Sequence, residues 1–131
     1  MLDIEVIGGE SVSSDGPSTV DVEELCVLAL SSAGIEEGHV AVEFVDVARM
    51  RELNRDYRSI DEPTDVLSFG IDEAGAATGP RELGDIVICP EHTEDLREAI
   101  VHGALHLSGM DHETDEGEML ALQSELMRWV Q

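Results

Sequence analysis

Three histidines lie within eleven residues of this 131-residue chain, in the segment HGALHLSGMDH that begins at position 102. His102 and His106 are four residues apart, so on a helix they would share one face. Gly109 follows them and can end the helix in a left-handed conformation, after which the chain can bring His112 back towards the same point. Three converging imidazoles are typical of a catalytic zinc site that keeps its fourth position open. The segment therefore predicts one zinc ion per chain, held by His102, His106 and His112.

The same segment differs at one position from the zinc-protease motif HExxHxxGxxH. Gly103 stands where those proteases have the glutamate that acts as the general base, so the sequence predicts a metal site without peptidase chemistry. An alternative ligand set uses Asp111 in place of His112, which would suit non-haem iron. Asp85 and Asp111 are both candidates for a general base or for a carboxylate that orients a histidine, and a packing or capping role is the alternative for each.

The charge of the chain is strongly one-sided, with 30 acidic residues against 7 basic ones and a formal net charge of −23. All seven basic residues are arginines, and four of them lie between positions 49 and 58. Such a charge repels polyanions and, taken alone, argues against RNA, DNA or an anionic membrane as a partner. Adaptation to high salt is another explanation of the same composition. The sequence also lacks an apolar run long enough to span a membrane and a signal segment, which predicts a cytoplasmic protein.

Apolar periodicity and capping residues predict a single domain over residues 1–131, of the α+β (mixed α/β) class, with a small mixed sheet of about four strands packed by helices. The expected strands cover residues 3–7, 39–45, 66–71 and 84–89, and the last of them is apolar enough for a central position. Four helices are expected to follow N-caps at Ser18, Asp46, Thr93 and Thr114. The apolar stripes of the first and last helices are predicted to be Val20, Leu25, Leu28 and Ala29, and Met119, Leu122, Leu126 and Trp129. Cys26 and Cys89 are expected to be buried, inert thiols.

Two further segments precede the histidines: LNRDYRSIDEPTDVLSF at 53–69 and LGDIVICP at 83–90. Together with HGALHLSGMDH, they resemble the YbeY family of bacterial metal-dependent endoribonucleases, which act in ribosomal RNA maturation and ribosome quality control. The resemblance runs from Asp46 to Gln131. It implies a mixed sheet with the metal in a cleft, a zinc triad of His102, His106 and His112, and a functional arginine at Arg58. Relative to the family, the connection from Cys89 to His102 is short, which predicts a shortened or lost helix there.

These observations predict a zinc-dependent endoribonuclease specific for single-stranded RNA, with ribosomal RNA as substrate and His102 and Arg58 as catalytic residues. Arg55 and Arg58 are expected to bind the substrate, because a guanidinium matches the geometry of a phosphate. Pairing with neighbouring carboxylates on a solvated helix face is the alternative for Arg51 and Arg55. Ribosomal proteins or a ribosome-associated GTPase are possible further partners. The competing functions are a metallohydrolase acting on a peptide or small molecule, and a non-catalytic zinc protein on the ribosome.

Overall fold

The computed structural model describes residues 2–13, 15–70, 82–110 and 114–130, except for the side chain of Ser11. Within them the chain alternates short strands and helices, much as its periodicity predicts. The strands are β1 (Leu2–Ile7), β2 (Gly38–Phe44), β3 (Val66–Gly70) and β4 (Glu82–Ile88), and the α-helices are α1 (Thr19–Ser32), α2 (Val47–Arg58), α3 (Leu96–Leu107) and α4 (Glu118–Val130). Two 3₁₀ helices, Gly9–Ser11 and Pro90–His92, follow β1 and β4.

The four strands form one mixed sheet in the order β1-β2-β4-β3. β1, β2 and β4 run parallel to each other, and β3 pairs with β4 in the antiparallel direction. β4 is therefore an interior strand, which explains its nearly continuous apolar sequence. The predicted α+β fold with a four-stranded mixed sheet is confirmed.

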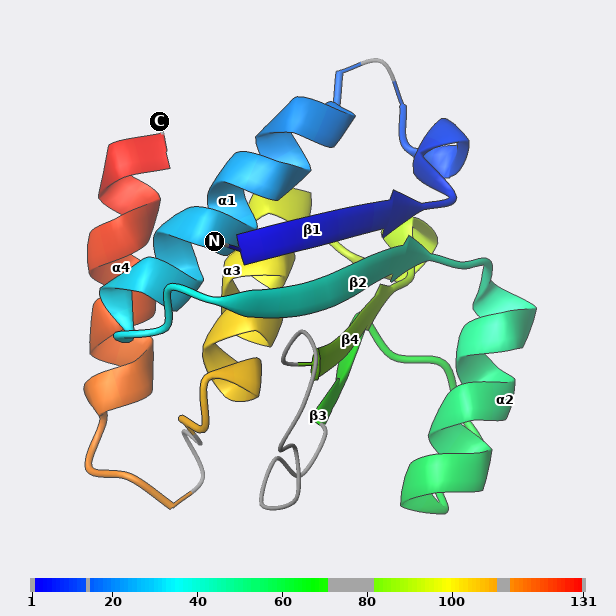
Figure 1. Ribbon diagram of the computed structural model, residues 1–131. Helices are drawn as coiled ribbons and strands as arrows, with labels where there is room; N and C mark the ends of the chain where they lie inside the picture. The colour runs from blue at the N-terminus through cyan, green and yellow to red at the C-terminus, as the bar shows by residue number, and fades with distance from the viewer. Residues whose placement is uncertain (1, 14, 71–81, 111–113, 131) are drawn as a thin grey trace.

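Helices cover both faces of the sheet (Figure 1). α1, α3 and α4 lie on one side and enclose the main core, which includes the fully buried Val40, Val42, Ile86 and Ile88 of the sheet. α2 lies on the other side, where Met50 and Leu53 form a second cluster with Leu67, Val87 and Cys89. Since successive residues of a strand point to opposite faces, Ile86 and Val87 belong to different clusters. This alternation decides which strand residues can contact the histidine-bearing helix α3.

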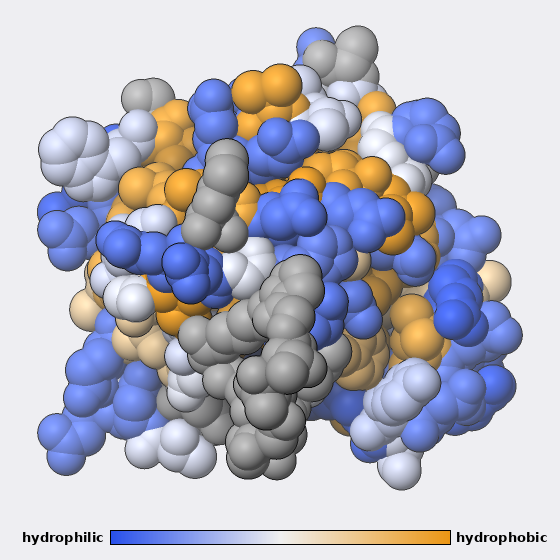
Figure 2. Space-filling view, in the orientation of Figure 1, coloured by the Kyte–Doolittle hydropathy of each residue, from blue (hydrophilic) through white to orange (hydrophobic). Residues whose placement is uncertain are grey.

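Beyond α2, charged side chains occupy the same face of the sheet. His39 of β2 lies between two carboxylates, with Nδ1 2.7 Å from Oε1 of Glu82 and Nε2 3.3 Å from Oε1 of Glu5. The hydrogen bond to Glu82 is the main reason that the pKa of His39 is raised. Figure 2 shows hydrophilic side chains over much of the surface seen in that view, with apolar patches between them.

The predicted helix starts are correct for the first two helices and wrong for the last two. Ser18 caps α1 through a reciprocal capping box with Asp21, and the Asp46 side chain accepts a hydrogen bond from the backbone N–H of Arg49 at the start of α2. Asp95, two residues after Thr93, caps α3 by accepting from the N–H of Glu98. The Thr93 hydroxyl instead donates to the carbonyl oxygen of Cys89 and closes the short 3₁₀ turn.

The last helix begins later than expected, at Glu118. The carboxylate of Asp115, and not the hydroxyl of Thr114, accepts from the N–H of Met119 at 2.9 Å. The described connection between β4 and α3 contains one helix, the three-residue 3₁₀ helix Pro90–His92. The expected shortening of this connection is therefore seen. Several residues near the start of a helix can act as its N-cap. The sequence alone does not identify which of them the chain uses, because the choice depends on where the helix docks.

Two predicted core residues are exposed. Val20 is 58% exposed and Trp129 is 78% exposed, whereas Leu25, Ala29, Met119 and Leu126 are buried as predicted. Leu28 and Leu122 are partly buried against the same core. Val20 lies in the first turn of α1 and Trp129 in the last turn of α4, and both side chains face away from the core on which the neighbouring Val22 and Val130 pack. Cys26 and Cys89 are buried and unpaired, as expected.

Candidate active site

His102 and His106 project from the same face of α3. Their ring centroids are 4.8 Å apart with the planes at 76°, the arrangement expected of residues one helical turn apart. The helix ends immediately afterwards at Ser108, and Gly109 follows with a φ of +103°, so the predicted left-handed turn is confirmed. His112 and Asp111, the third predicted ligand and its alternative, lie outside the described residues.

Each of the two imidazoles is held through its Nδ1 atom. Nδ1 of His102 lies 2.7 Å from Oε1 of Gln123 on α4, and Nδ1 of His106 lies 3.1 Å from the backbone carbonyl oxygen of Met110. Carbonyl oxygens only accept hydrogen bonds, so both Nδ1 atoms carry the donated proton. In a neutral imidazole the lone pair is then on Nε2, the nitrogen able to bind a metal. The two rings are therefore prepared in the same tautomer.

Gly103, between the two histidines, lies where α3 packs closely against the sheet. A Cβ added to Gly103 would be 2.6 Å from Cγ2 of Ile86 on β4 and 3.3 Å from the hydroxyl of Ser68 on β3. That hydroxyl donates to the carbonyl oxygen of Gly103 at 3.1 Å. A glutamate cannot occupy this position without displacing Ile86, which is fully buried. The absence of the protease base is thus imposed by helix-to-sheet packing.

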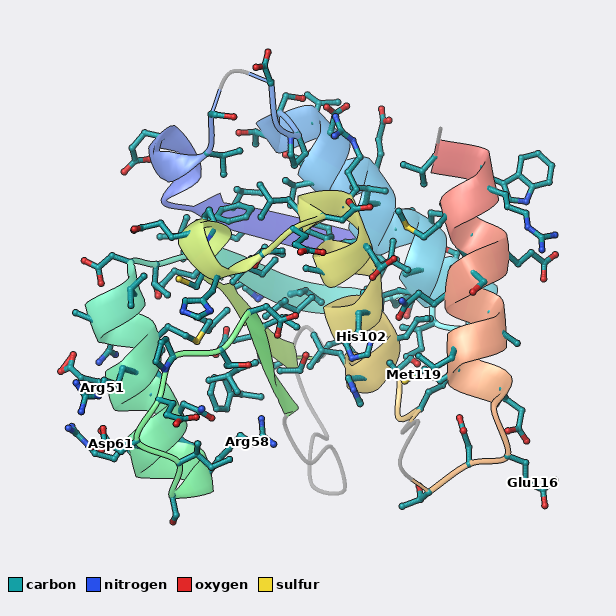
Figure 3. All side chains as sticks on the ribbon, turned by 180° about the vertical axis from the view of Figure 1, so that it is seen from behind. Arg51, Arg58, Asp61, His102, Glu116 and Met119 are labelled. Atoms are coloured by element: carbon teal, nitrogen blue, oxygen red, sulfur yellow. The ribbon has the colours of Figure 1, made fainter. Side chains whose placement is uncertain are left out.

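The histidines open into a cleft of about 1210 Å³. One side of the cleft comes from α3 and α4, and the other from the end of α2 and the segment that leads into β3. Among the described residues, the lining includes His102, His106, Gln123, Arg58, Asp65 and His92. Figure 3 shows His102 on α3 and Arg58 reaching from the end of α2 towards the same side. Two elements that are far apart in sequence therefore bring imidazole and guanidinium groups to one cleft.

Arg58 differs from the other arginines of α2. Arg51 makes a two-point ion pair with Asp61, with distances of 2.8 and 3.1 Å, on the outer side of the helix (Figure 3). Arg55 pairs with Asp56 at 3.3 Å and is not part of the cleft lining. Within the described part of the chain, Arg58 makes no ion pair. The structure supports the solvated-face alternative for Arg51 and Arg55, and it places Arg58 in the lining of the cleft.

Asp85 lies on the opposite face of the sheet from the histidines. It points to the side of α2, where it lines a separate groove of about 310 Å³ with residues such as Tyr57 and Phe69. The expectation that Asp85 orients a histidine or acts as a base beside it is therefore wrong. Its β4 neighbour Ile86 is the residue that faces α3, because side chains alternate along a strand.

The cleft is acidic. Among its described lining residues, four carboxylates, those of Asp65, Glu94, Asp95 and Glu98, accompany the single guanidinium of Arg58. Two of these carboxylates have structural roles: Asp95 caps α3, and Asp65 accepts from the N–H of Val66 at 2.8 Å. The sequence did not identify Gln123 or this set of acids as part of the site. Their distance from the histidines depends on how α4 and the connection from α2 to β3 dock against α3.

The fold and this cleft define a class of small α+β proteins in which two histidines of one helix face a cleft beside a mixed sheet. Residues 18–131 match the family model described as Endoribonuclease YbeY. The Endoribonuclease YbeY of Geobacillus thermodenitrificans is 42% identical over 128 residues, covering 81% of this chain and 82% of the relative. That of Macrococcus caseolyticus is 34% identical over 146 residues, covering 97% of this chain and 94% of the relative.

A solved structure agrees with these relatives. The solution structure of TM1509 from Thermotoga maritima is 28% identical in sequence and matches with a TM-score of 0.56, covering 93% of this chain and 85% of the other. The chain belongs to the YbeY family. The resemblance inferred from the three sequence segments is thereby confirmed.

The packing at Gly103 makes a prediction about stability. In a helix, alanine is favoured over glycine by about 1 kcal/mol, yet we expect Gly103→Ala to lower the free energy of unfolding by about 1–2 kcal/mol, because Ile86 must move. Gly70→Ala is the control, since a Cβ there meets no atom of the described residues within 4 Å. Urea denaturation of both variants measures the difference. A Gly103→Ala protein as stable as the parent would contradict the close approach, and relief by Ile86→Ala in a double-mutant cycle would support it.

Proposed function

We propose that this protein is a metal-dependent endoribonuclease that cuts single-stranded RNA during ribosomal RNA maturation and ribosome quality control. The observation that carries the proposal is the pair of imidazoles on α3, both protonated on Nδ1, opening into a cleft that also contains Arg58. The names of the relatives, Endoribonuclease YbeY, support RNA as the substrate. A ribosomal RNA substrate would put the activity in the cytoplasm, with ribosomal proteins or a ribosome-associated GTPase as further partners.

The donor set suits zinc, at one ion per chain. His102, His106 and His112 would hold it through nitrogen alone, a ligand set that zinc accepts and that magnesium and calcium do not favour. When bound, zinc lowers the pKa of a coordinated water to about 7 and polarises phosphoryl oxygens. Cys26 and Cys89 are buried on other parts of the fold, and burial raises the pKa of both thiols, Cys26 to about 12. Neither thiol competes as a ligand, because metal binding requires the thiolate.

The protein itself would position and stabilise the phosphodiester. Arg58 carries a planar fork of donors that matches two oxygens of a phosphate. Its side chain lines the same cleft as the histidines. Negative charge grows on the phosphoryl oxygens during cleavage, so a fixed guanidinium lowers the barrier. Arg55 lies outside this cleft and pairs with Asp56, so a contact from Arg55 to the RNA backbone would have to replace that ion pair. His102 would hold the metal from the opposite wall of the cleft.

The activity and the metal can be tested together. We expect the purified protein to hold about one zinc per chain and to cleave single-stranded RNA, and His106→Ala to lose both, because the metal is then left with too few imidazole ligands. Elemental analysis and a fluorogenic RNA oligonucleotide measure the two quantities. Peptide hydrolysis should be undetectable, since Gly103 replaces the base. A His106→Ala protein with unchanged zinc content, or metal-dependent proteolysis lost in that variant, would contradict the proposal.

A second prediction concerns Arg58. We expect Arg58→Ala to reduce RNA cleavage by about 10²-fold or more while zinc content and melting temperature stay nearly unchanged, because a donor to the transition-state charge is lost. Arg58→Lys should restore part of the activity, since lysine keeps the charge but not the fork. Arg49→Ala is the matched control on the same helix: Arg49 pairs with Glu52 at 3.7 Å and lines the opposite groove. Equal losses in the two alanine variants would remove Arg58 from the mechanism.

A third prediction follows from the charge. RNA must approach a protein of net charge −23 through a cleft lined by four carboxylates, so we expect kcat/KM to rise as NaCl increases from about 0.1 to about 1 M, over which the Debye length falls from about 10 to about 3 Å. Nucleic-acid binding by basic surfaces weakens over that range. Circular dichroism at each salt concentration separates this effect from a gain in folding. A falling kcat/KM in a fully folded protein would contradict the electrostatic argument.

A further inference from the structure

Gln123 is the residue that links the last helix to the candidate metal site. Its side-chain oxygen Oε1 lies 2.7 Å from Nδ1 of His102, across the boundary between α4 and α3 and 21 positions away in the sequence. Both side chains are partly buried, and Gln123 itself lines the cleft. A hydrogen bond between two partly buried side chains is partly shielded from competing water, and it restricts the rotation of the ring it reaches.

The position of Gln123 is fixed by the core on both sides of it. Met119 is four residues before it and Leu126 three residues after it, so all three share one face of α4. Met119 is fully buried and Leu126 is 5% exposed. The helix cannot rotate Gln123 away from His102 without exposing these two anchors. The amide therefore acts from a rigid support.

The two histidines are oriented by different means. His106 is held by the backbone carbonyl of Met110, which the turn at Gly109 carries back over the end of α3, so its support is local in sequence. His102 is held by a side chain of another helix. The same Nδ1 atom is engaged in both rings, which makes Nε2 the lone-pair nitrogen in both. Of the two supports, that of His102 is the one that a substitution can remove.

We propose that Gln123 is a positioning residue that fixes the Nδ1–H tautomer and the orientation of His102, and so tunes metal affinity; this rests on the proposed metal-dependent function. Outer acceptors of this kind typically change metal affinity by 10- to 100-fold. An amide does so without adding a further negative charge to a cleft that already holds four carboxylates. With its amide reversed, Gln123 would donate to Nδ1 and put the proton of His102 on Nε2, which would block coordination.

The test uses the full chain with imidazole nitrogens labelled with ¹⁵N. In the metal-free protein at about pH 8.5, where imidazoles are neutral, we expect NMR to show His102 protonated on Nδ1, and Gln123→Leu to lose that preference. Gln123→Glu, whose carboxylate can only accept, should keep it. Ser124→Leu is the matched control, because Ser124 is the exposed next residue of α4. Melting temperatures show which variants are folded.

Chelator competition supplies the second readout. We expect zinc to bind about 10- to 100-fold more weakly to Gln123→Leu, with Gln123→Glu and Ser124→Leu at or above the parent affinity. His102 protonated on Nε2 in the parent protein, or zinc affinity unchanged in a folded Gln123→Leu variant, would overturn the proposal. The outcome is independent of RNA cleavage: a protein that fails to cut RNA but shows this tautomer and this affinity loss would refute the proposed function and retain the role of Gln123.

Discussion

The close contact between α3 and the sheet at Gly103 is the constraint on which the site depends. With no side chain at that position, the helix approaches Ile86 and Ser68 closely enough for the serine hydroxyl to donate to the helix backbone. The residues on either side of Gly103 are then held at a fixed height above β4 and β3. The side chains of His102 and His106 lie on one face of α3 and line the cleft. A larger residue at 103 would lift the helix and move both imidazoles.

The close contact at Gly103 also explains why the chain lacks the general base of the zinc-protease motif. In the protease motif the position after the first histidine carries the base, but here it faces the interior of the protein. Of the groups that line the cleft, the imidazoles of His102 and His106, the guanidinium of Arg58 and the amide of Gln123 suit the binding and stabilisation of a phosphate better than the activation of a water for peptide attack. Membership in the YbeY family agrees with that division.

The sequence predicted the features that depend on neighbours in the chain. The histidine spacing, the Gly109 turn and the Ser18 cap each follow from local geometry, and β4 could be recognised as a central strand from its apolar residues. Features that depend on docking were missed: the cap at Asp95, the exposure of Trp129, the support of His102 by Gln123 and the direction in which Asp85 points. The side of a sheet on which a residue lies is decided by register and packing, which periodicity alone does not determine.

The central claim is that Nε2 atoms of His102 and His106 bind a catalytic metal at the cleft. Anomalous diffraction from crystals of the zinc-loaded protein, recorded on both sides of the zinc absorption edge, tests it most directly. We expect one anomalous peak in contact with Nε2 of both histidines, while their Nδ1 atoms keep their bonds to Gln123 and Met110. A peak bound through Nδ1, or located away from these two side chains, would contradict it.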